Sequence, residues 1–475
     1  MRRKPPAQRR RVEYNYRPNV VVKFRDDVKL PYDDRADRAL EEEGHGEWQR
    51  LKAQFPGISI RKQFNSVTTS QIRVLVAKAR RREDKYRPPN FLTYFVIDLP
   101  ARADANELVK SLLHWRMVET AYLDPPAEDP VVTNVDPRLA GHDPRMAQQG
   151  YLRAAPAGID AEFAWGHPGG DGSGQHFIDL EQGWTRDHED LVARGAQVLF
   201  GVEIPQSRPH GTSVLGVVCA VANQVGCRGI AHSVASAHVV SHSGNANNVA
   251  NAILAAINNL ESGGILLLEV QRPEMEINNT WLPTEFFQAD FQMIEMATAI
   301  GITVVEAAGN SGHDLDTVSD RHGKRAFVRG VRDSRAILVG GASSGVPHVR
   351  LDSNFGSRVD CYAWGEDVVA PTSSDSGPVL KKAYRDDFNG TSSAAAIIAG
   401  AALVVQGVAV ARHGKHLSPM QMRRVLSDPA TGTNSGNPAV DRIGVMPNLR
   451  AIINGNAIGQ ALTLFTPVQP SGPGR

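Results

Sequence analysis

Two features of the sequence predict an α/β protein with a three-layer, doubly wound, mostly parallel sheet, preceded by a small α+β domain. From residue 146 onward, short apolar runs alternate with helical segments of small and apolar residues, a pattern typical of βαβ units. Before about residue 124, four strand-like runs and two amphipathic segments follow one another without that alternation, which favours a mixed unit. At 475 residues the chain is also too long for one ordinary core.

The N-terminal part divides into a tail, a small domain and a linker. Residues 1–17 are basic, and we expect a disordered tail that is solvated and not bound to nucleic acid. The small domain covers residues 18–124, with strands expected at 19–24, 58–64, 91–100 and 118–124 and helices at 68–83 and 104–117. Residues 125–145 are rich in proline and aspartate, which predicts an exposed linker that is easily cut.

The second domain covers residues 146–455 and is followed by a C-terminal tail, 456–475. Its strands are expected at 175–180, 196–204, 236–243, 264–270, 302–309 and 335–343, and its helices at 211–223, 245–261, 289–301 and from Ser392 to about Arg412. In such sheets the functional side chains gather at the carboxyl ends of the strands. Residues that follow an apolar strand directly are therefore the first candidates for a site.

Composition excludes several classes of protein. The three cysteines, Cys219, Cys227 and Cys361, are too few for a disulfide framework and form no CxxC pair, so we expect buried free thiols and no zinc site. The formal net charge of +1 decides nothing about partners. No apolar run has the length and setting of a membrane span, and the basic N-terminus is expected to be solvated, so neither a membrane nor nucleic acid is an expected partner. No apolar segment follows the basic N-terminus, which predicts a cytoplasmic protein, with unconventional export as the alternative.

Two short motifs offer a nucleophile and a base, each at the start of a helix. Ser392 follows Gly390-Thr391 and opens a helix of small and apolar residues, so backbone N–H groups and the positive end of the helix dipole lie near its hydroxyl. His210 precedes Gly211-Thr212 and a second apolar helix. A lone serine in this position is usually a helix cap, so the two motifs are informative only together.

Two further residues complete the set. Asp179 ends an apolar strand, where its carboxylate is expected to accept from His210 Nδ1 and to fix the imidazole tautomer. Asn310 ends another apolar strand, and its amide is expected to donate to an oxyanion. The order Asp179, His210, Ser392 is one of the few chain orders known for a Ser-His-Asp triad.

These segments resemble those of the subtilisin-like serine proteases, the subtilases, over about residues 140–455. The similar segments are Ile178-Asp179 with His188-Glu189-Asp190-Leu191, His210-Gly211-Thr212 with Gly229-Ile230-Ala231, Ala307-Ala308-Gly309-Asn310-Ser311-Gly312, and Gly390-Thr391-Ser392. The resemblance implies a serine endopeptidase that hydrolyses protein or peptide substrates through an acyl-enzyme on Ser392. It implies no cofactor for catalysis.

One departure from the family concerns substrate binding. Leu268-Glu269-Val270-Gln271 stands where the resemblance places a strand rich in serine and glycine. Glu269, Val270 and Gln271 are therefore the expected substrate-binding residues, with a reshaped specificity pocket. Two roles for Glu269 stay open, selection of a basic side chain or a structural hydrogen bond.

The N-terminal domain is similar, more loosely, to the inhibitory propeptides of subtilases. This similarity implies that the domain inhibits its own enzyme, and the exposed linker predicts self-cleavage between about residues 124 and 145. The alternative is a protease-like binding or sensing protein that acts mainly through its N-terminal domain. Many subtilases bind calcium, but the acidic segment 313–320 matches no known calcium loop, so the metal content stays unassigned.

Overall fold

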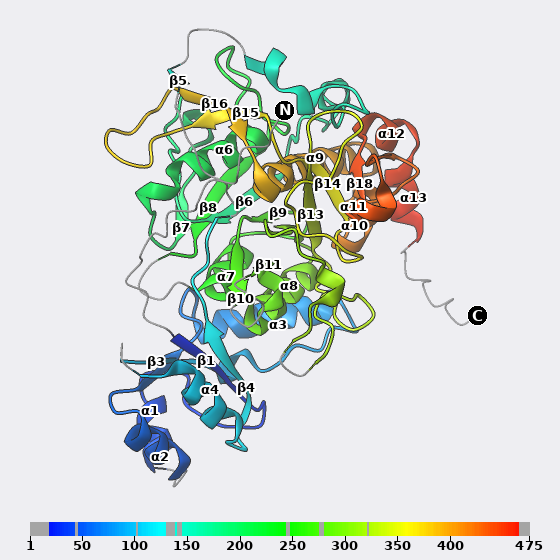
Figure 1. The fold of residues 1–475 in the computed structure, drawn as a ribbon. Coiled ribbons are helices and arrows are strands. Elements are labelled where there is room, and N and C mark those ends of the chain that lie inside the picture. The colour runs from blue at the N-terminus through cyan, green and yellow to red at the C-terminus, as the bar shows by residue number, and fades with distance from the viewer. Residues whose placement is uncertain are drawn as a thin grey trace, which may run out of the picture. The chain divides into compact units, whose positions relative to one another are not determined.

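The computed structural model describes residues 19–42, 46–100, 103–129, 138–139, 145–243, 248–274, 280–320 and 323–464. The chain divides into two compact units, drawn in Figure 1: residues 1–64 with 90–126, and residues 65–89 with 127–475. The predicted tail 1–17 and most of the predicted linker lie outside the described residues.

The first unit is an antiparallel sheet with helices, as the sequence predicted. The strands pair in the order β2-β3-β1-β4 and are β1 (Asn19–Phe24), β2 (Ser59–Lys62), β3 (Tyr94–Asp98) and β4 (Val118–Asp124). The helices are α1 (Ala36–Glu42), α2 (Gly46–Gln54) and α4 (Ala105–Leu113). The sequence pattern missed α1 and α2 because each buries only two side chains, which gives no recognisable periodicity.

Helix α3 (Thr69–Arg82) was predicted in the small domain but belongs to the second unit. It packs against α8 (Gln288–Ile300) through a face that buries Ile72, Leu75 and Ala79. Thr68 caps the helix with a reciprocal capping box to Gln71, which satisfies two backbone donors. Sequence spacing identifies an amphipathic helix but not the core into which its apolar face packs.

The second unit is built on a nine-stranded sheet in the order β17-β18-β14-β13-β12-β9-β6-β8-β7, parallel except for β17. These strands are β6 (His176–Glu181), β7 (Val198–Phe200), β8 (Ser236–Ser241), β9 (Ile265–Leu268), β12 (Thr303–Ala307), β13 (Ile337–Ala342), β14 (Cys361–Trp364), β17 (Gly432–Asn434) and β18 (Val445–Pro447). Two smaller sheets contain β10 (Gln271–Glu274) with β11 (Thr280–Pro283), and β15 (Val368–Thr372) with β16 (Ala383–Phe388) and β5 (Arg138–Leu139).

Helices cover both faces of the large sheet, which gives the three layers (Figure 1). Helices α6 (Arg208–Cys219) and α9 (Gly390–His413) form one layer, and α7 (Val249–Asn258) and α8 form the other. The remaining short helices are α5 (Ala161–Ala164), α10 (Pro419–Leu426), α11 (Pro438–Asp441), α12 (Leu449–Asn454) and α13 (Ala457–Leu464). Residues 457–464 were predicted as tail, but they form α13, which buries Ile458 and Ala461.

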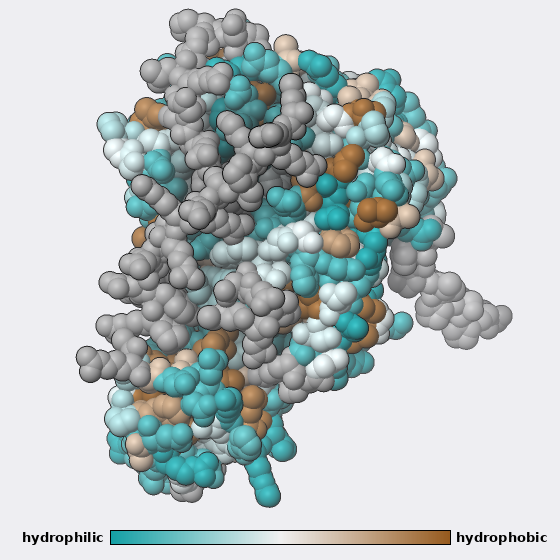
Figure 2. Space-filling view, in the orientation of Figure 1, coloured by the Kyte–Doolittle hydropathy of each residue, from teal (hydrophilic) through white to brown (hydrophobic). Residues whose placement is uncertain are grey.

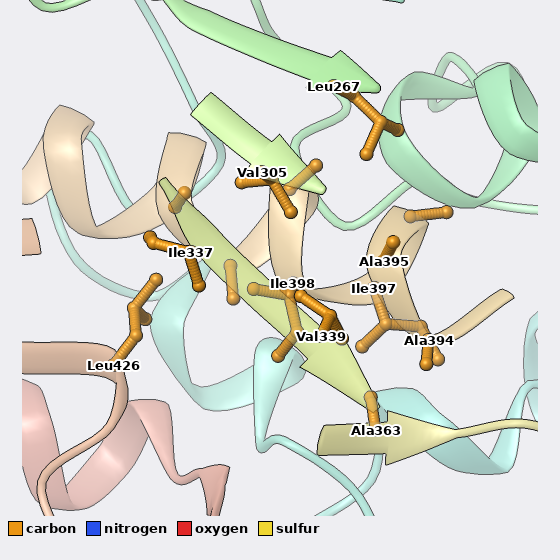
Figure 3. Packing of buried hydrophobic residues seen from close by; sticks show 14 of the residues in the cluster. Leu267, Val305, Ile337, Val339, Ala363, Ala394, Ala395, Ile397, Ile398 and Leu426 are labelled. Atoms are coloured by element: carbon orange, nitrogen blue, oxygen red, sulfur yellow. The ribbon is translucent and has the colours of Figure 1, made fainter. Parts of the chain in front are cut away.

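Helix α9 is the centre of the core. In Figure 3 side chains from the sheet and from α9 pack together, among them Leu267, Val305, Ile337, Val339, Ala394, Ile397 and Ile398. By length and composition α9 meets the criteria for a membrane span, but 89% of its most apolar window is buried inside the protein. Small residues let the helix approach the sheet closely. On the face drawn in Figure 2, hydrophobic residues lie in small groups among hydrophilic ones.

Candidate active site

Strand β6 places two buried carboxyl groups on one face of the sheet. Asp179 and Glu181 are two residues apart, so their side chains leave the strand on the same side. Glu181 Oε2 lies 2.7 Å from His210 Nδ1, whereas Asp179 Oδ2 accepts from Trp184 Nε1 at 2.7 Å. The prediction that Asp179 holds His210 is therefore wrong, because the carboxyl bound to the imidazole is that of Glu181.

Position along the strand explains this difference. Glu181 is the last residue of β6, and Asp179 lies two residues back, about 7 Å further from the carboxyl edge of the sheet. His210 lies in the first turn of α6, and only the carboxyl at the strand end reaches it. Gly183 follows in a tight turn, where an added Cβ would come within 2.2 Å of Ile204 O.

The residues after His210 fix the start of α6. Thr212 Oγ1 donates to Arg208 O at 2.6 Å and accepts from Thr185 N at 2.9 Å. A Cβ on Gly211 would come within 2.5 Å of the Trp184 ring, so glycine is required where the helix meets the turn after β6. His210 is 4% exposed, and its Nε2 makes no hydrogen bond within the described part of the chain. One ring nitrogen is thus held and the other is available.

Ser392 and Asn310 lie at the same end of the sheet. Ser392 is fully buried in the first turn of α9. Asn310 lies just after β12, and its Oδ1 accepts a hydrogen bond of 2.9 Å from the Thr391 backbone N–H. The Gly309 backbone N–H donates to Thr391 Oγ1 at 3.2 Å. These bonds hold the Asn310 amide beside the nucleophile. Because Oδ1 is occupied by a backbone N–H, the NH2 group is the end that can donate.

The three predicted substrate-binding residues lie at the end of β9 with different surroundings. Val270 is fully buried in the core. Gln271 pairs with Glu128 as an antiparallel bridge, with Gln271 N donating to Glu128 O at 3.0 Å and Glu128 N donating to Gln271 O at 3.1 Å. Glu269 is fully buried and its carboxyl interacts with the Ser392 hydroxyl. The backbone of Gln271 therefore pairs with an extended segment of the chain itself, and the Glu269 carboxyl contacts Ser392.

Segment 127–129 of the chain itself lies against these residues. Besides the bridge at Glu128, Ala127 O accepts from Gln182 Nε2 at 3.4 Å. Asp129 also comes close to Glu181 and His210. One carboxylate oxygen of Asp129, one of Glu181 and one ring nitrogen of His210 all lie within 4.8 Å of one another. Sequence reasoning missed Asp129, because nothing in a proline-rich linker shows where it meets the sheet.

The sequence matches the profile of the subtilase family over residues 159–445. The chain belongs to the subtilase family. It is a serine endopeptidase, a hydrolase of peptide bonds. Over 348 residues it is 29% identical to alkaline elastase YaB of Bacillus sp. (strain YaB), covering 70% of this chain and 80% of that protein. Over 272 residues it is 28% identical to subtilisin Savinase of Lederbergia lenta, covering 56% and 87%.

Two solved structures share the fold of this subtilase. Fervidolysin from Fervidobacterium pennivorans, described as a keratinolytic enzyme related to subtilisin, aligns with a TM-score of 0.54 and 15% identity over 94% of this chain and 62% of that chain. A protease from Pseudoalteromonas arctica PAMC 21717 aligns with a TM-score of 0.50 and 19% identity over 66% and 98%. At these identities the likeness concerns the fold alone.

The site of this subtilase contains four acidic side chains. Burial raises the pKa of Asp179 and of Asp129 to about 7 each, and it raises the pKa of Glu181 and of Glu269 well above 4.5. Mutual repulsion of the carboxylates adds to the effect for Asp129, Glu181 and Glu269. Burial, with the Arg385 guanidinium, lowers the pKa of His210 to about 3. With the linker in place, the imidazole is therefore neutral, and burial favours the protonated form of each of these carboxyl groups.

The acidic segment 313–320, which was weighed as a calcium site, is neutralised by a side chain. Arg442 Nη1 lies 2.7 Å from Asp314 Oδ2, and the same guanidinium pairs with Asp316. Asp316 also accepts from Ser357 N at 3.0 Å. A bound guanidinium occupies the carboxylates that a cation would need, so these residues do not fit calcium. The metal content of the protein stays unassigned.

The sequence contained a pattern that favours Glu181 as the partner of His210. Two acids, Asp179 and Glu181, alternate at the end of one strand, and Glu181 stands two residues before Gly183. The acid nearest the carboxyl end, followed closely by a turn glycine, is the one that can face a neighbouring loop. Chemical type alone favoured the aspartate, and position along the strand favoured the glutamate.

Proposed function

We propose that this subtilase hydrolyses peptide bonds through an acyl-enzyme on Ser392, with Glu181 and His210 as its acid–base pair. The single observation that carries the assignment is the 2.7 Å contact between Glu181 Oε2 and His210 Nδ1. With Glu181 ionised, this contact makes Nδ1 the donor nitrogen and leaves Nε2 as the basic one. Nε2 is buried and unpaired among the described residues, as a base awaiting a proton requires.

In the first step His210 Nε2 takes the hydroxyl proton of Ser392 while Oγ forms a bond to the scissile carbonyl carbon. The carbonyl electron pair moves to oxygen, where the Asn310 amide and the Ser392 backbone N–H stabilise the negative charge. The imidazolium, held by Glu181, then protonates the leaving amine as the C–N bond breaks. Water repeats the sequence on the ester and restores Ser392.

The substrate backbone is expected to pair with Gln271. The chain's own Glu128 already makes that antiparallel pair, so an extended peptide fits the same groups. Specificity for side chains is left unassigned. The neutral, buried environment of Glu269 argues against its use as an anionic pocket for a basic side chain.

We further propose that the N-terminal region inhibits the enzyme until the chain is cut. The support is segment 127–129, which occupies the strand edge that a substrate needs and brings Asp129 next to His210. Cleavage is expected on the C-terminal side of Asp129, within the interval between residues 124 and 145 that the sequence indicated.

The test is the intact mass of the purified wild type beside Ser392→Ala, followed by labelling with a fluorophosphonate. We expect a wild type that loses its N-terminal region and is labelled at Ser392, and a mutant that stays whole and unlabelled. A wild type that stays whole but is labelled would refute self-maturation and leave the enzyme assignment intact. A wild type that neither hydrolyses peptides nor takes the label would favour a binding or sensing protein.

A further inference from the structure

Glu269 is a buried acid in contact with the nucleophile, and the reaction described above does not use it. It follows β9 directly, between β6 and β12 in the sheet, and its backbone N donates to Leu180 O at 3.0 Å. Its side chain is fully buried and interacts with the Ser392 hydroxyl. Neither carboxyl oxygen has a hydrogen bond of normal geometry. A buried acid without such bonds is costly to keep, which makes a functional reason worth testing.

The side chains around Glu269, on each of the elements named below, are acidic or neutral. Asp179 and Glu181 face it from β6, Asp129 from the linker and Ser392 from α9, while His210 on α6 is bound to Glu181. On β12, Glu306 is held by the Glu285 backbone N–H at 2.9 Å. Burial and then Asp179 and Asp129 raise the pKa of Glu269, and the Ser392 hydroxyl lowers it in part. The neutral carboxyl is therefore the resting form.

The two protonation states of Glu269 have opposite effects on Ser392. A hydroxyl has one proton to donate and two lone pairs that accept. A neutral Glu269 can donate to Ser392 Oγ, and the Ser392 proton is then available to His210 Nε2, which has no partner among the described residues. An ionised Glu269 is an acceptor only, so it takes the Ser392 proton and turns it away from His210.

We propose that Glu269 is a positioning residue for the nucleophile. Its neutral carboxyl donates to Ser392 Oγ and directs the Ser392 proton to His210, and its ionised form holds that proton and stops acylation. The proposal rests on the proposed function, because it takes Ser392 as the nucleophile. No atom of Glu269 enters the substrate, and the proton and electron movements of acylation are unchanged.

The experiment compares Glu269→Gln, Glu269→Leu and the control Glu306→Gln. Glu306 is a fully buried acid on the adjacent strand, so its substitution tests the loss of a buried carboxyl away from Ser392. The rate of fluorophosphonate labelling and kcat/KM for a peptide are measured from acidic to alkaline pH, on the same chain form checked by intact mass. Thermal unfolding shows which variants fold.

The wild type and Glu306→Gln are expected to lose activity on the alkaline side as Glu269 ionises. Glu269→Gln keeps an N–H donor but cannot ionise, so it should stay active and lose the alkaline decline. Glu269→Leu has no donor, and its labelling rate should fall by about 10²-fold because the nucleophile is misplaced, with the loss in kcat and not in KM.

An alkaline decline in Glu269→Gln like that of the wild type would overturn the proposal, as would Glu269→Leu labelled at the wild-type rate. If Glu269→Leu does not fold, the pH profile of Glu269→Gln decides alone. Failure of the wild type to react with the fluorophosphonate after its N-terminal region has been removed is a different result, because it excludes Ser392 as the nucleophile and refutes the proposed function itself.

Discussion

Replacing Asp129 by Asn should make the closed position of the linker, in which segment 127–129 pairs with Gln271, much less sensitive to pH. In the closed chain, burial and the neighbouring carboxyls raise the pKa of Asp129 from its ordinary 3.8 to about 7. A raised pKa means that the closed form binds the proton more tightly than the released linker does. Closure is therefore favoured at low pH and is lost as the pH rises through about 7. Asparagine keeps the size of the side chain and cannot ionise.

The two pKa values set the size of the effect. Between about pH 5 and about pH 8, the released linker gains on the order of 3 kcal/mol over the closed form, or about 10²-fold in the opening equilibrium. This range lies above 3.8, so the released carboxyl is ionised throughout. Asp179 has a similarly raised pKa, so part of the pH dependence must survive the substitution, and the difference between the two chains isolates Asp129.

Hydrogen exchange of the bridge amides measures this opening directly. Glu128 N–H and Gln271 N–H each donate across the bridge, and their protection should fall by about 10²-fold from low to high pH in a Ser392→Ala background, which keeps the chain whole. With Asp129→Asn added, most of that fall should vanish, whereas Glu128→Gln should keep it. Equal pH dependence with and without Asp129 would refute the reasoning.

Two predictions concern the catalytic groups. Glu181→Gln should lower kcat by about 10³–10⁴-fold, because the amide no longer secures the imidazole tautomer or stabilises the imidazolium. Asp179→Asn should lower kcat by less than about 10-fold, since Asp179 is bound to Trp184. Steady-state kinetics on a peptide compare the two variants, and the reverse ranking would restore Asp179 as the triad acid. Asn310→Ala should lower kcat by about 10²–10³-fold with little change in KM, and a loss confined to KM would show that Asn310 binds substrate and does not stabilise the oxyanion.

The sequence was sufficient for the alternation of strands and helices and insufficient for the neighbours of single side chains. The runs that became β6, β9 and β12 were recognisable because parallel strands are buried on both faces. Strand β14 was not identified, because CYAW is short and lacks a β-branched residue.

The same limit applies inside the site. His210, Asn310 and Ser392 were found because each lies at a junction between an apolar element and a glycine-containing turn. The contact of Glu269 with Ser392 depends on how β9 and α9 are placed against each other, and no local pattern records that placement. Asp129 meets His210 only through the antiparallel bridge at Glu128. The proposed pH dependence rests on those two acids, and their positions required the folded chain.

Under the proposed inhibition, the bridge between Glu128 and Gln271 joins an inhibitory segment and its target within one chain. A tethered segment faces its site at an effective concentration near the millimolar range, which a free substrate at micromolar concentration cannot match. Cutting the linker converts this closure into an ordinary binding equilibrium between two chains. Dilution then releases the cleaved fragment, whereas no dilution can open the intact chain. Under the proposed self-cleavage, one peptide bond in the linker therefore determines whether activity depends on protein concentration.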